Sequence, residues 1–208
     1  MPTPDFDLYL VTDRSQTRGR DLLWVLERAL EGGVRAIQLR EKDLGGRDLF
    51  HLAAKTRELC VRYDAQLFVN DRIDVALAVD AAGVQLGKTS VPIETARTLL
   101  GAQKLIGYSA HSLEEAQIAQ QMGTDFVLFG PVYVTQSKAR YGTPQGAEAL
   151  KKIVENVALP VYAIGGIKQN NIIAVRLAGV RGVALISAII GADRPNEAAR
   201  EMVGLLQG

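Results

Sequence analysis

The residues best placed to bind an anion stand in one short segment of the sequence. Gln38, Arg40 and Lys42 occupy alternate positions, which point the same way if the segment is an extended strand. Two cations and an amide donor on one face suit a polyanion such as pyrophosphate. The alternative is a salt-bridged strand end, in which Glu41 and Asp43 neutralise the cations. For this segment taken alone, the salt-bridged strand end is the preferred interpretation.

A carboxylate that could hold a metal ion follows a second apolar run. Asn70 and Asp71 come directly after the run at residues 66–69. Mg²⁺ typically binds one or two carboxylates together with substrate phosphates, so Asp71 is a candidate ligand. The alternative is that Asp71 caps a helix beginning near Ile73, which is a very common use of aspartate.

A long loop and two glycine-permissive turns carry groups that suit a phosphate. The loop extends to Gly146, and hydroxyls and an ammonium at its spacing can wrap a phosphate. The turns follow two other apolar runs, and backbone N–H groups at such turns often bind phosphate in barrels. A polar surface loop and ordinary turns are the alternatives. The candidate residues are Thr135, Ser137 and Lys138 in the loop and Gly166, Ile186 and Ser187 in the turns.

Two histidines and one cysteine are the remaining candidates for proton transfer or nucleophilic chemistry. His111 stands two residues after Ser109 and could transfer protons near neutral pH. Its alternative role is to flank a helix cap at Ser112, and the sequence favours neither. His51 lies within a helical stripe, where a structural or exposed role is expected. Cys60 has a helical neighbourhood that suggests a packed thiol rather than a nucleophile.

The elements that must position these groups alternate regularly along the chain. Short apolar runs without strict polar alternation are typical of strands buried on both faces. Segments with helical spacing lie between them, and one opens with a capping box at Ser112 and Glu115. Glycines end several of the helical segments. The expected strands are residues 8–11, 36–39, 66–69, 83–86, 105–108, 126–129, 161–164 and 182–186.

This alternation predicts an α/β protein, a single (β/α)8 TIM barrel spanning residues 1–208. An open doubly wound sheet is the structural rival, but its phosphate fingerprint should follow the first strand, where residues 11–15 have no glycine turn. In a (β/α)8 barrel the active site lies at the carboxyl ends of the strands. The candidate residues follow the expected strands, so they should converge on one face.

Length and composition exclude several classes of protein. The chain has 208 residues, 48% of them hydrophobic and 23% charged, which suits one globular domain rather than a disordered chain. Its net charge of +1 argues against a broad nucleic-acid footprint. No apolar run is long enough for a membrane span and no signal peptide is evident, so a cytoplasmic protein is expected. One cysteine excludes an intrachain disulfide and a multi-cysteine metal site.

Together these motifs resemble the thiamin phosphate synthase family and its relative, the thiazole tautomerase. The resemblance covers nearly the whole chain, from Tyr9 to Ile189. Each motif is weak alone, whereas the ordered set is highly specific. The motifs are residues 38–42, 70–71, 83–87, 107–111, 130–131, 135–138 and 163–167.

The resemblance implies a (β/α)8 barrel and a transferase activity of thiamin biosynthesis, thiamine-phosphate diphosphorylase. The reaction joins hydroxymethylpyrimidine pyrophosphate to thiazole phosphate and releases pyrophosphate, with Mg²⁺ as the cofactor. Barrels of this kind often dimerise, so a homodimer is one possible state. Carried over by position, the pyrimidine pyrophosphate would face Gln38, Arg40, Lys42, Asn70, Ser109 and Lys138. Asp71 would hold Mg²⁺, and the thiazole phosphate would face Thr135 and Ser137 with backbone at Gly166, Ile186 and Ser187.

Two departures from the family pattern leave alternatives open. The synthases usually carry histidine where this chain has Gln85, and a second metal-binding carboxylate where it has Ser90. A tautomerase, which lacks the full metal site and would use His111 as acid and base, is therefore the second hypothesis. A non-catalytic protein that binds thiazole phosphate or thiamin phosphate is the third. Gln38, Lys42 and Asp71 favour the synthase, because a tautomerase has no evident use for a pyrophosphate clamp.

Overall fold

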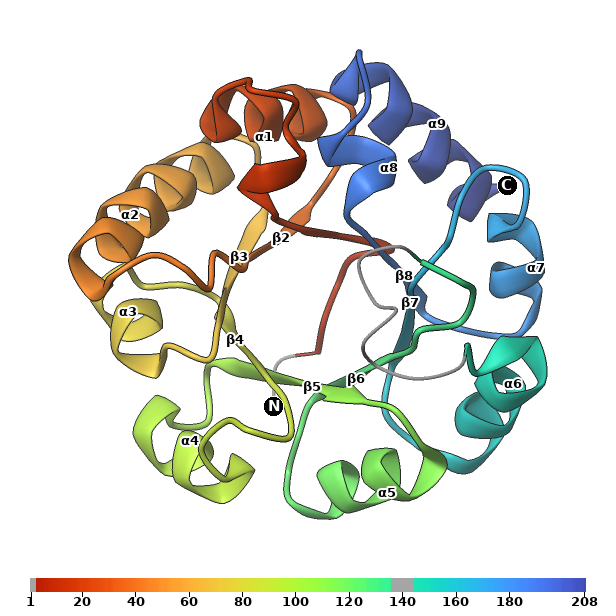
Figure 1. The fold of residues 1–208 in the computed structure, drawn as a ribbon. Helices are drawn as coiled ribbons and strands as arrows, with labels where there is room; N and C mark the ends of the chain where they lie inside the picture. The colour runs from red at the N-terminus through yellow and green to blue at the C-terminus, as the bar shows by residue number, and fades with distance from the viewer. Residues whose placement is uncertain (1–2, 136–143) are drawn as a thin grey trace.

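Eight parallel strands close into a barrel in the computed structural model, which describes residues 3–135 and 144–208. Each strand pairs with its sequence neighbour, and β1 pairs with β8 to complete the ring (Figure 1). The strands are β1 (Leu8–Val11), β2 (Ala36–Leu39), β3 (Gln66–Asn70), β4 (Gly83–Leu86), β5 (Leu105–Ala110), β6 (Phe126–Phe129), β7 (Val161–Ile164) and β8 (Gly182–Leu185).

Helices form an outer ring around the strands (Figure 1). Their apolar stripes pack on the outward strand side chains, which makes one continuous core between the two layers. The helices are η1 (Arg14–Gln16), α1 (Leu22–Glu31), α2 (Gly46–Arg62), α3 (Ile73–Ala78), α4 (Ile93–Leu100), α5 (Leu113–Gln121), α6 (Gly146–Asn156), α7 (Ile172–Leu177), α8 (Ser187–Ile190) and α9 (Pro195–Gln207).

The (β/α)8 TIM barrel predicted from the sequence is thus confirmed, and the bounds of β3, β5 and β8 differ from the expected ones by one or two residues. β5 continues to Ala110, so Ser109 is a strand residue rather than a loop residue. β8 ends at Leu185, which places Ile186 in the turn before α8. The capping box is half formed. Ser112 accepts the N–H of Glu115, but the Glu115 carboxylate accepts the N–H of His111 instead of that of Ser112.

Aromatic rings fill the inside of the barrel. Phe6, Tyr9, Phe68, Phe126 and Tyr162 are all buried, and the rings in contact have centroids 4.7–6.4 Å apart. Phe6 precedes β1 and closes the amino end of the barrel, where its carbonyl accepts the Tyr162 hydroxyl at 2.8 Å. Because the rings occupy the interior, a ligand can enter only from the opposite end.

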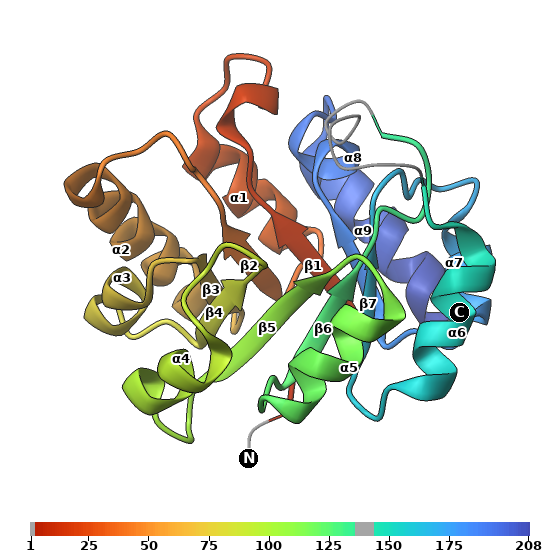
Figure 2. The same ribbon diagram turned by 60° about the horizontal axis from the view of Figure 1, so that its bottom comes forward.

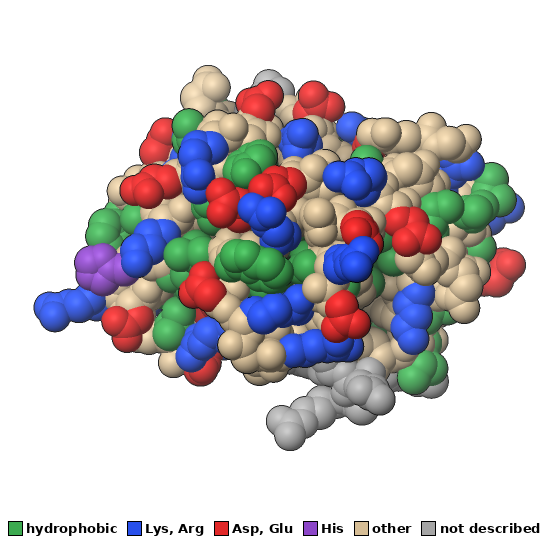
Figure 3. Space-filling model, turned by 90° about the horizontal axis from the view of Figure 1, so that it is seen from above, with side chains coloured by type: hydrophobic (Ala, Val, Ile, Leu, Met, Phe, Trp, Pro, Cys, Tyr) green, Lys and Arg blue, Asp and Glu red, His purple; other side chains and the backbone are tan. Residues whose placement is uncertain are grey.

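Charge on the outside of the molecule is mixed in sign. On the face seen in Figure 3, Lys and Arg side chains alternate with Asp and Glu, and apolar side chains lie singly or in small groups between them. One of the ion pairs that tie neighbouring loops joins Arg18 to Asp193. The charge balance of the sequence is therefore distributed over this face rather than gathered into one basic area.

Candidate active site

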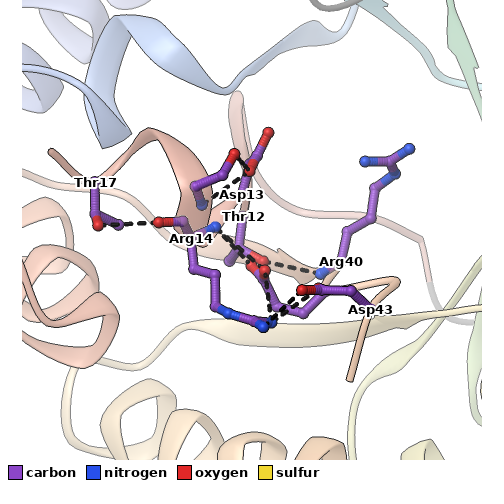
Figure 4. Close-up of polar contacts among 8 residues, drawn as sticks. Thr12, Asp13, Arg14, Thr17, Arg40 and Asp43 are labelled. Carbon is purple, nitrogen blue, oxygen red and sulfur yellow. Dashed lines mark hydrogen bonds and ion pairs between the residues drawn. The ribbon is translucent and has the colours of Figure 1, made fainter. Parts of the chain in front are cut away.

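The carboxyl ends of β1 and β2 are joined by a buried threonine. Thr12 follows β1, is fully buried, and its hydroxyl oxygen accepts the backbone N–H of Arg40 at 2.9 Å. Figure 4 shows this contact at the base of a polar cluster formed by the two loops that follow these strands. The backbone from which the Arg40 side chain projects is thus fixed to the neighbouring strand.

The acids of the 38–43 segment pair with Arg14, so the salt-bridged strand end expected from the sequence alone is wrong. The Arg14 guanidinium donates to both oxygens of Asp43, at 2.9 and 2.6 Å (Figure 4). Its backbone N–H lies 3.2 Å from each oxygen of Glu41. Among the residues that the structure describes, no carboxylate lies within ion-pair distance of Arg40 or Lys42. Both cations therefore remain available to an anion.

Glu41 is a buried carboxylate held by hydrogen bonds. Burial raises the pKa of Glu41, although hydrogen bonds from Thr12 and the Arg14 N–H, and the charge of Arg14, act in the opposite direction. Its side chain is only 3% exposed. Removing any of these donors would leave the buried charge poorly compensated.

Arg40 and Lys42 line a cavity of about 780 Å³ between the loops after β1 and β2. β2 ends at Leu39, so strand alternation does not extend to Lys42, and the predicted common face of three side chains is not produced by the strand itself. In Figure 4 the Arg40 side chain extends away from Arg14 and Asp43. Burial alone would raise the pKa of Asp13, but hydrogen bonds from Ser15 and Gln16 and the nearby charge of Arg40 lower it below its usual value.

A chain of polar side chains crosses the barrel above the aromatic rings. Gln38 donates its amide to the Tyr9 oxygen at 3.3 Å, and the Tyr9 hydroxyl donates to Oε1 of Gln85 at 3.4 Å. Nε2 of Gln85 then donates to the Ser109 hydroxyl at 3.0 Å. A side chain at position 107 would meet Oε1 of Gln85 at 2.4 Å, so Gly107 leaves room for this amide. Because Ser109 accepts from Gln85, its own proton points toward another acceptor.

The predicted metal-binding residues lie together. Asn70 donates to one oxygen of Asp71 at 2.7 Å, and the Ser90 hydroxyl donates to the other. Ser90 in turn accepts the N–H of Gly87 at 2.7 Å. The alternative of a helix cap at Asp71 is wrong, because α3 is preceded by Arg72 and has no side-chain cap. Asp71 instead has a φ of +61°, which turns the exposed carboxylate toward the loop after β4.

A second cavity, of about 620 Å³, lies at the carboxyl ends of β7 and β8. Gly166, Ile186, Ser187 and Thr135 line it, as the sequence predicts for one binding region. Gly166 has a φ of +65°, and a side chain there would meet the carbonyl of Val134 at 2.6 Å. Only glycine therefore lets the backbone after β7 approach the loop after β6 so closely.

His111 is held by two neighbouring elements. Its Nδ1 lies 2.6 Å from the carbonyl oxygen of Gly130, which fixes Nδ1 as the protonated nitrogen of the neutral ring. Its backbone N–H donates to Glu115 at 2.8 Å. His111 therefore flanks the helix cap, and its ring is held in a fixed orientation against the loop after β6.

The remaining candidates divide into three cases. Ser137 and Lys138 lie outside the described residues. Cys60 is fully buried, and burial raises the pKa of its thiol to about 12, which confirms the packed role. His51 is exposed on α2, with its ring edge against Phe50.

Sequence reasoning missed two contributors to this site, Tyr9 and Arg14. Tyr9 is two residues from Val11 on β1, and both belong to the barrel interior. The period-2 pattern of β1 could therefore have placed Tyr9 beneath the site. Nothing in the sequence identified Arg14 as part of the site, because the acids with which it pairs lie 27 and 29 residues away.

Within residues 3–135 and 144–208, no three His, Cys, Asp or Glu side chains gather as a metal cluster. The same ranges contain no helix long and apolar enough to cross a membrane. Asp71 is thus the sole carboxylate of the Asn70–Asp71–Ser90 group. Such a group would need most of a metal's other ligands to come from substrate and water.

Comparison with known proteins gives one family. A family model described as thiamine monophosphate synthase matches residues 8–189. A relative from Geobacter sulfurreducens is 52% identical over 99% of this chain and 97% of its own length. The thiamine-phosphate synthase of Desulfitobacterium hafniense strain Y51 is 42% identical, with 97% of each chain covered. The solved structure of thiamine phosphate pyrophosphorylase from Pyrococcus furiosus is 42% identical, covers 97% of this chain and 96% of its own, and superposes with a TM-score of 0.89. This chain belongs to the thiamine monophosphate synthase family.

Proposed function

We propose that this chain is a transferase that joins hydroxymethylpyrimidine pyrophosphate to thiazole phosphate and releases pyrophosphate. The observation that carries the proposal is the pair Arg40 and Lys42, which form no ion pair with a described carboxylate, at the carboxyl end of a barrel of this family. The full-length relatives named thiamine-phosphate synthase support the same activity. Two cavities at one end of the barrel provide room for two phosphorylated substrates.

The barrier of this reaction is charge separation. The bond between the pyrimidine methylene carbon and the pyrophosphate oxygen breaks, and the leaving pyrophosphate takes the electron pair. The thiazole nitrogen then donates its lone pair to the pyrimidine cation to form the new C–N bond. Arg40 and Lys42 would stabilise the negative charge that builds on the leaving group, because fixed cations need no reorganisation during the reaction. Lys138 is proposed to join them from the loop after β6.

Ser109 and Asn70 would orient the pyrimidine. The Ser109 proton is directed away from Gln85 and is available to an acceptor on the substrate. Asn70 lies at the end of β3, between this hydroxyl and Arg40 in strand order.

We assign the thiazole phosphate to the cavity at β7 and β8, where backbone N–H groups at Gly166 and Ser187 and the Thr135 hydroxyl suit a phosphate. Ser137 is proposed for the same phosphate.

The side chains of Asn70, Asp71 and Ser90 suit Mg²⁺ when the substrate and water supply the ion's other ligands. One carboxylate with an adjacent hydroxyl matches the habit of Mg²⁺, which takes one or two carboxylates and completes its shell with phosphates and water. Both Asp71 oxygens accept one hydrogen bond and keep a lone pair for a cation. Asp71 would therefore hold the ion, which when bound would neutralise charge on the pyrophosphate.

Ser90→Asp should strengthen the metal site. The Ser90 hydroxyl contacts Asp71, so a carboxylate at position 90 supplies a second ligand at the same place. We expect the variant to need several-fold less Mg²⁺ for half-maximal synthesis, and to gain a Mg²⁺-dependent rise in melting temperature without substrate. Ser112→Asp, at an exposed cap, is the control that adds the same charge elsewhere. If neither the Mg²⁺ requirement nor the melting temperature changes in Ser90→Asp, position 90 is not beside the metal.

The proposed function is tested by supplying both substrates with Mg²⁺ and measuring pyrophosphate and thiamin phosphate together. We expect both products in equal amounts, and neither with one substrate omitted. Titration calorimetry with thiazole phosphate, run beside this assay, separates a protein that only binds from one that turns over. Binding without any product would contradict the proposal.

His111→Asn should retain most of the synthase activity, because the reaction takes no proton from carbon. A tautomerase depends on such a transfer, and loss of its acid–base group typically costs ~10²–10⁴-fold. Asparagine can still donate to the Gly130 carbonyl that Nδ1 contacts, which makes it the conservative choice. Deuterium uptake by the thiazole carboxylate phosphate in D₂O that depends on His111, without any pyrophosphate release, would overturn the transferase.

A further inference from the structure

The segment after β2 carries a balanced set of charges in alternating order. Arg40, Glu41, Lys42 and Asp43 read positive, negative, positive, negative. Neighbouring charges of this kind tend to neutralise one another, which would leave no net attraction for an anion. The structure instead separates them, because both acids turn toward Arg14.

Arg14 engages each acid in a different way. It binds Asp43 through two parallel hydrogen bonds of 2.9 and 2.6 Å, the strong bidentate geometry of guanidinium and carboxylate. It binds Glu41 through its backbone N–H, and the guanidinium lies 3.7 Å from the same carboxylate. In Figure 4 these contacts lie on the side of the loop away from the Arg40 guanidinium.

A local cap holds Arg14 in place for this role. Asp13 precedes η1 and accepts the backbone N–H of Ser15 at 3.1 Å and the amide of Gln16 at 2.5 Å. The resulting turn aims the Arg14 N–H at Glu41. The loop after β1 is thus shaped to deliver one cation to the two acids of the next loop.

We propose that Arg14 is a positioning residue for anion binding, which diverts Glu41 and Asp43 so that Arg40 and Lys42 face the pyrophosphate. The inference rests on the proposed function for the identity of the anion. Five acids and four cations line this cavity, so what a bound anion meets depends on which acids are held away from Arg40 and Lys42. Without Arg14, Glu41 and Asp43 lose the only cation that pairs with them among the described residues, and a pyrophosphate would meet two uncompensated acids beside Arg40 and Lys42. Arg14 itself does not need to touch the substrate.

The test compares Arg14→Gln with the natural chain, using inorganic pyrophosphate in titration calorimetry and both substrates in steady-state assays. We expect pyrophosphate affinity to fall about tenfold and the KM of the pyrimidine pyrophosphate to rise similarly. The KM of thiazole phosphate should stay unchanged, since its proposed cavity lies at β7 and β8. Arg14→Lys keeps the charge but loses the bidentate geometry, so we expect its pyrophosphate affinity to lie between those of Arg14→Gln and the natural chain.

Rescue separates electrostatic diversion from a purely structural clamp. In Arg14→Gln/Asp43→Asn one of the released acids is gone, so we expect affinity to return to within about threefold of the natural value. If Arg14 acted only as a structural clamp, the affinity would not recover, because the double variant keeps neither of the ion pairs that Arg14 makes with Glu41 and Asp43. Arg18→Gln is the matched control: it removes a cation from the same loop whose partner, Asp193, belongs to another loop.

Two results for the variants would overturn the inference: unchanged pyrophosphate affinity in folded Arg14→Gln, or a double variant as weak as the single one. Melting temperature and circular dichroism identify folded variants, and Asp43→Asn alone provides a second variant that keeps Arg14. Failure of the proposed function gives a different pattern, because the natural chain would then bind pyrophosphate but make no thiamin phosphate. A natural chain that does not bind pyrophosphate would contradict both.

Discussion

Replacement of Arg40 by glutamine is expected to lower the turnover number by about 10²–10³-fold, the usual loss when one fixed donor to developing negative charge is removed. Arg40 is half-buried at the mouth of the barrel, and its backbone is fixed by Thr12, so its charge is already in place before the reaction. Single-turnover measurement of pyrophosphate release reports this step directly. Glutamine keeps part of the side-chain volume and a donor, but not the charge.

Arg35→Gln is the matched control for this experiment. Arg35 directly precedes β2, the strand that Arg40 follows, and its guanidinium donates to the carbonyls of Leu30 and Val34. We expect this variant to lose some stability and none of the turnover number. A folded Arg40→Gln variant with the natural rate of pyrophosphate release would show that Arg40 takes no part in the reaction.

Gln85→Leu is expected to destabilise the barrel by about 1–3 kcal/mol, the cost of leaving a buried polar group without its partner. Leucine has a similar volume but cannot accept the Tyr9 hydroxyl or donate to Ser109. Without the Gln85 donor, the Ser109 hydroxyl is free to rotate, so the KM of the pyrimidine pyrophosphate should rise as well. Urea unfolding and steady-state kinetics measure the two effects.

A double-mutant cycle with Tyr9→Phe identifies the hydrogen bond as the cause. The double variant removes both partners, so its cost should be smaller than the sum of the single costs by about 0.5–3 kcal/mol. Gln66→Leu is the control, because Oε1 of Gln66 is buried and has no partner among the described residues. We expect that substitution to cost little. Additive costs for Tyr9 and Gln85 would contradict a coupled chain of hydrogen bonds.

The strands were predictable because a parallel barrel buries both of their faces. β1, β2, β4, β6 and β7 begin and end at the expected residues, since glycine and polar residues bound each short apolar run. Strand ends are less certain, as β5 shows. The expected strand ends at Tyr108 because polar Ser109 interrupts the apolar run, although the backbone remains paired with β6 through Ala110.

The candidate site was predictable by type of residue but not by pairing. The carboxyl ends of the strands must meet, so polar residues following them converge on one face whatever their partners. Which acid pairs with which base depends on the direction of each loop. Arg14 reaches Glu41 and Asp43 only because a single helical turn follows β1. Asp71 likewise has a positive φ, which turns its carboxylate away from α3, the helix that its position before Ile73 suggests it would cap.

Because Phe6 and the other aromatic rings close the amino end of the barrel, that end is the better place to attach this protein to a solid support. The described chain begins at Thr3, shortly before Phe6, at the end of the barrel opposite α8 (Figure 2). A tether joined ahead of Pro4 would leave Phe6 stacked against Tyr162, with ring centroids 4.7 Å apart. The anchored barrels would then stand with their open mouths toward the solution. An immobilised layer made in this way presents every site to the flowing substrate, whereas attachment through the exposed Lys42 would block the mouth.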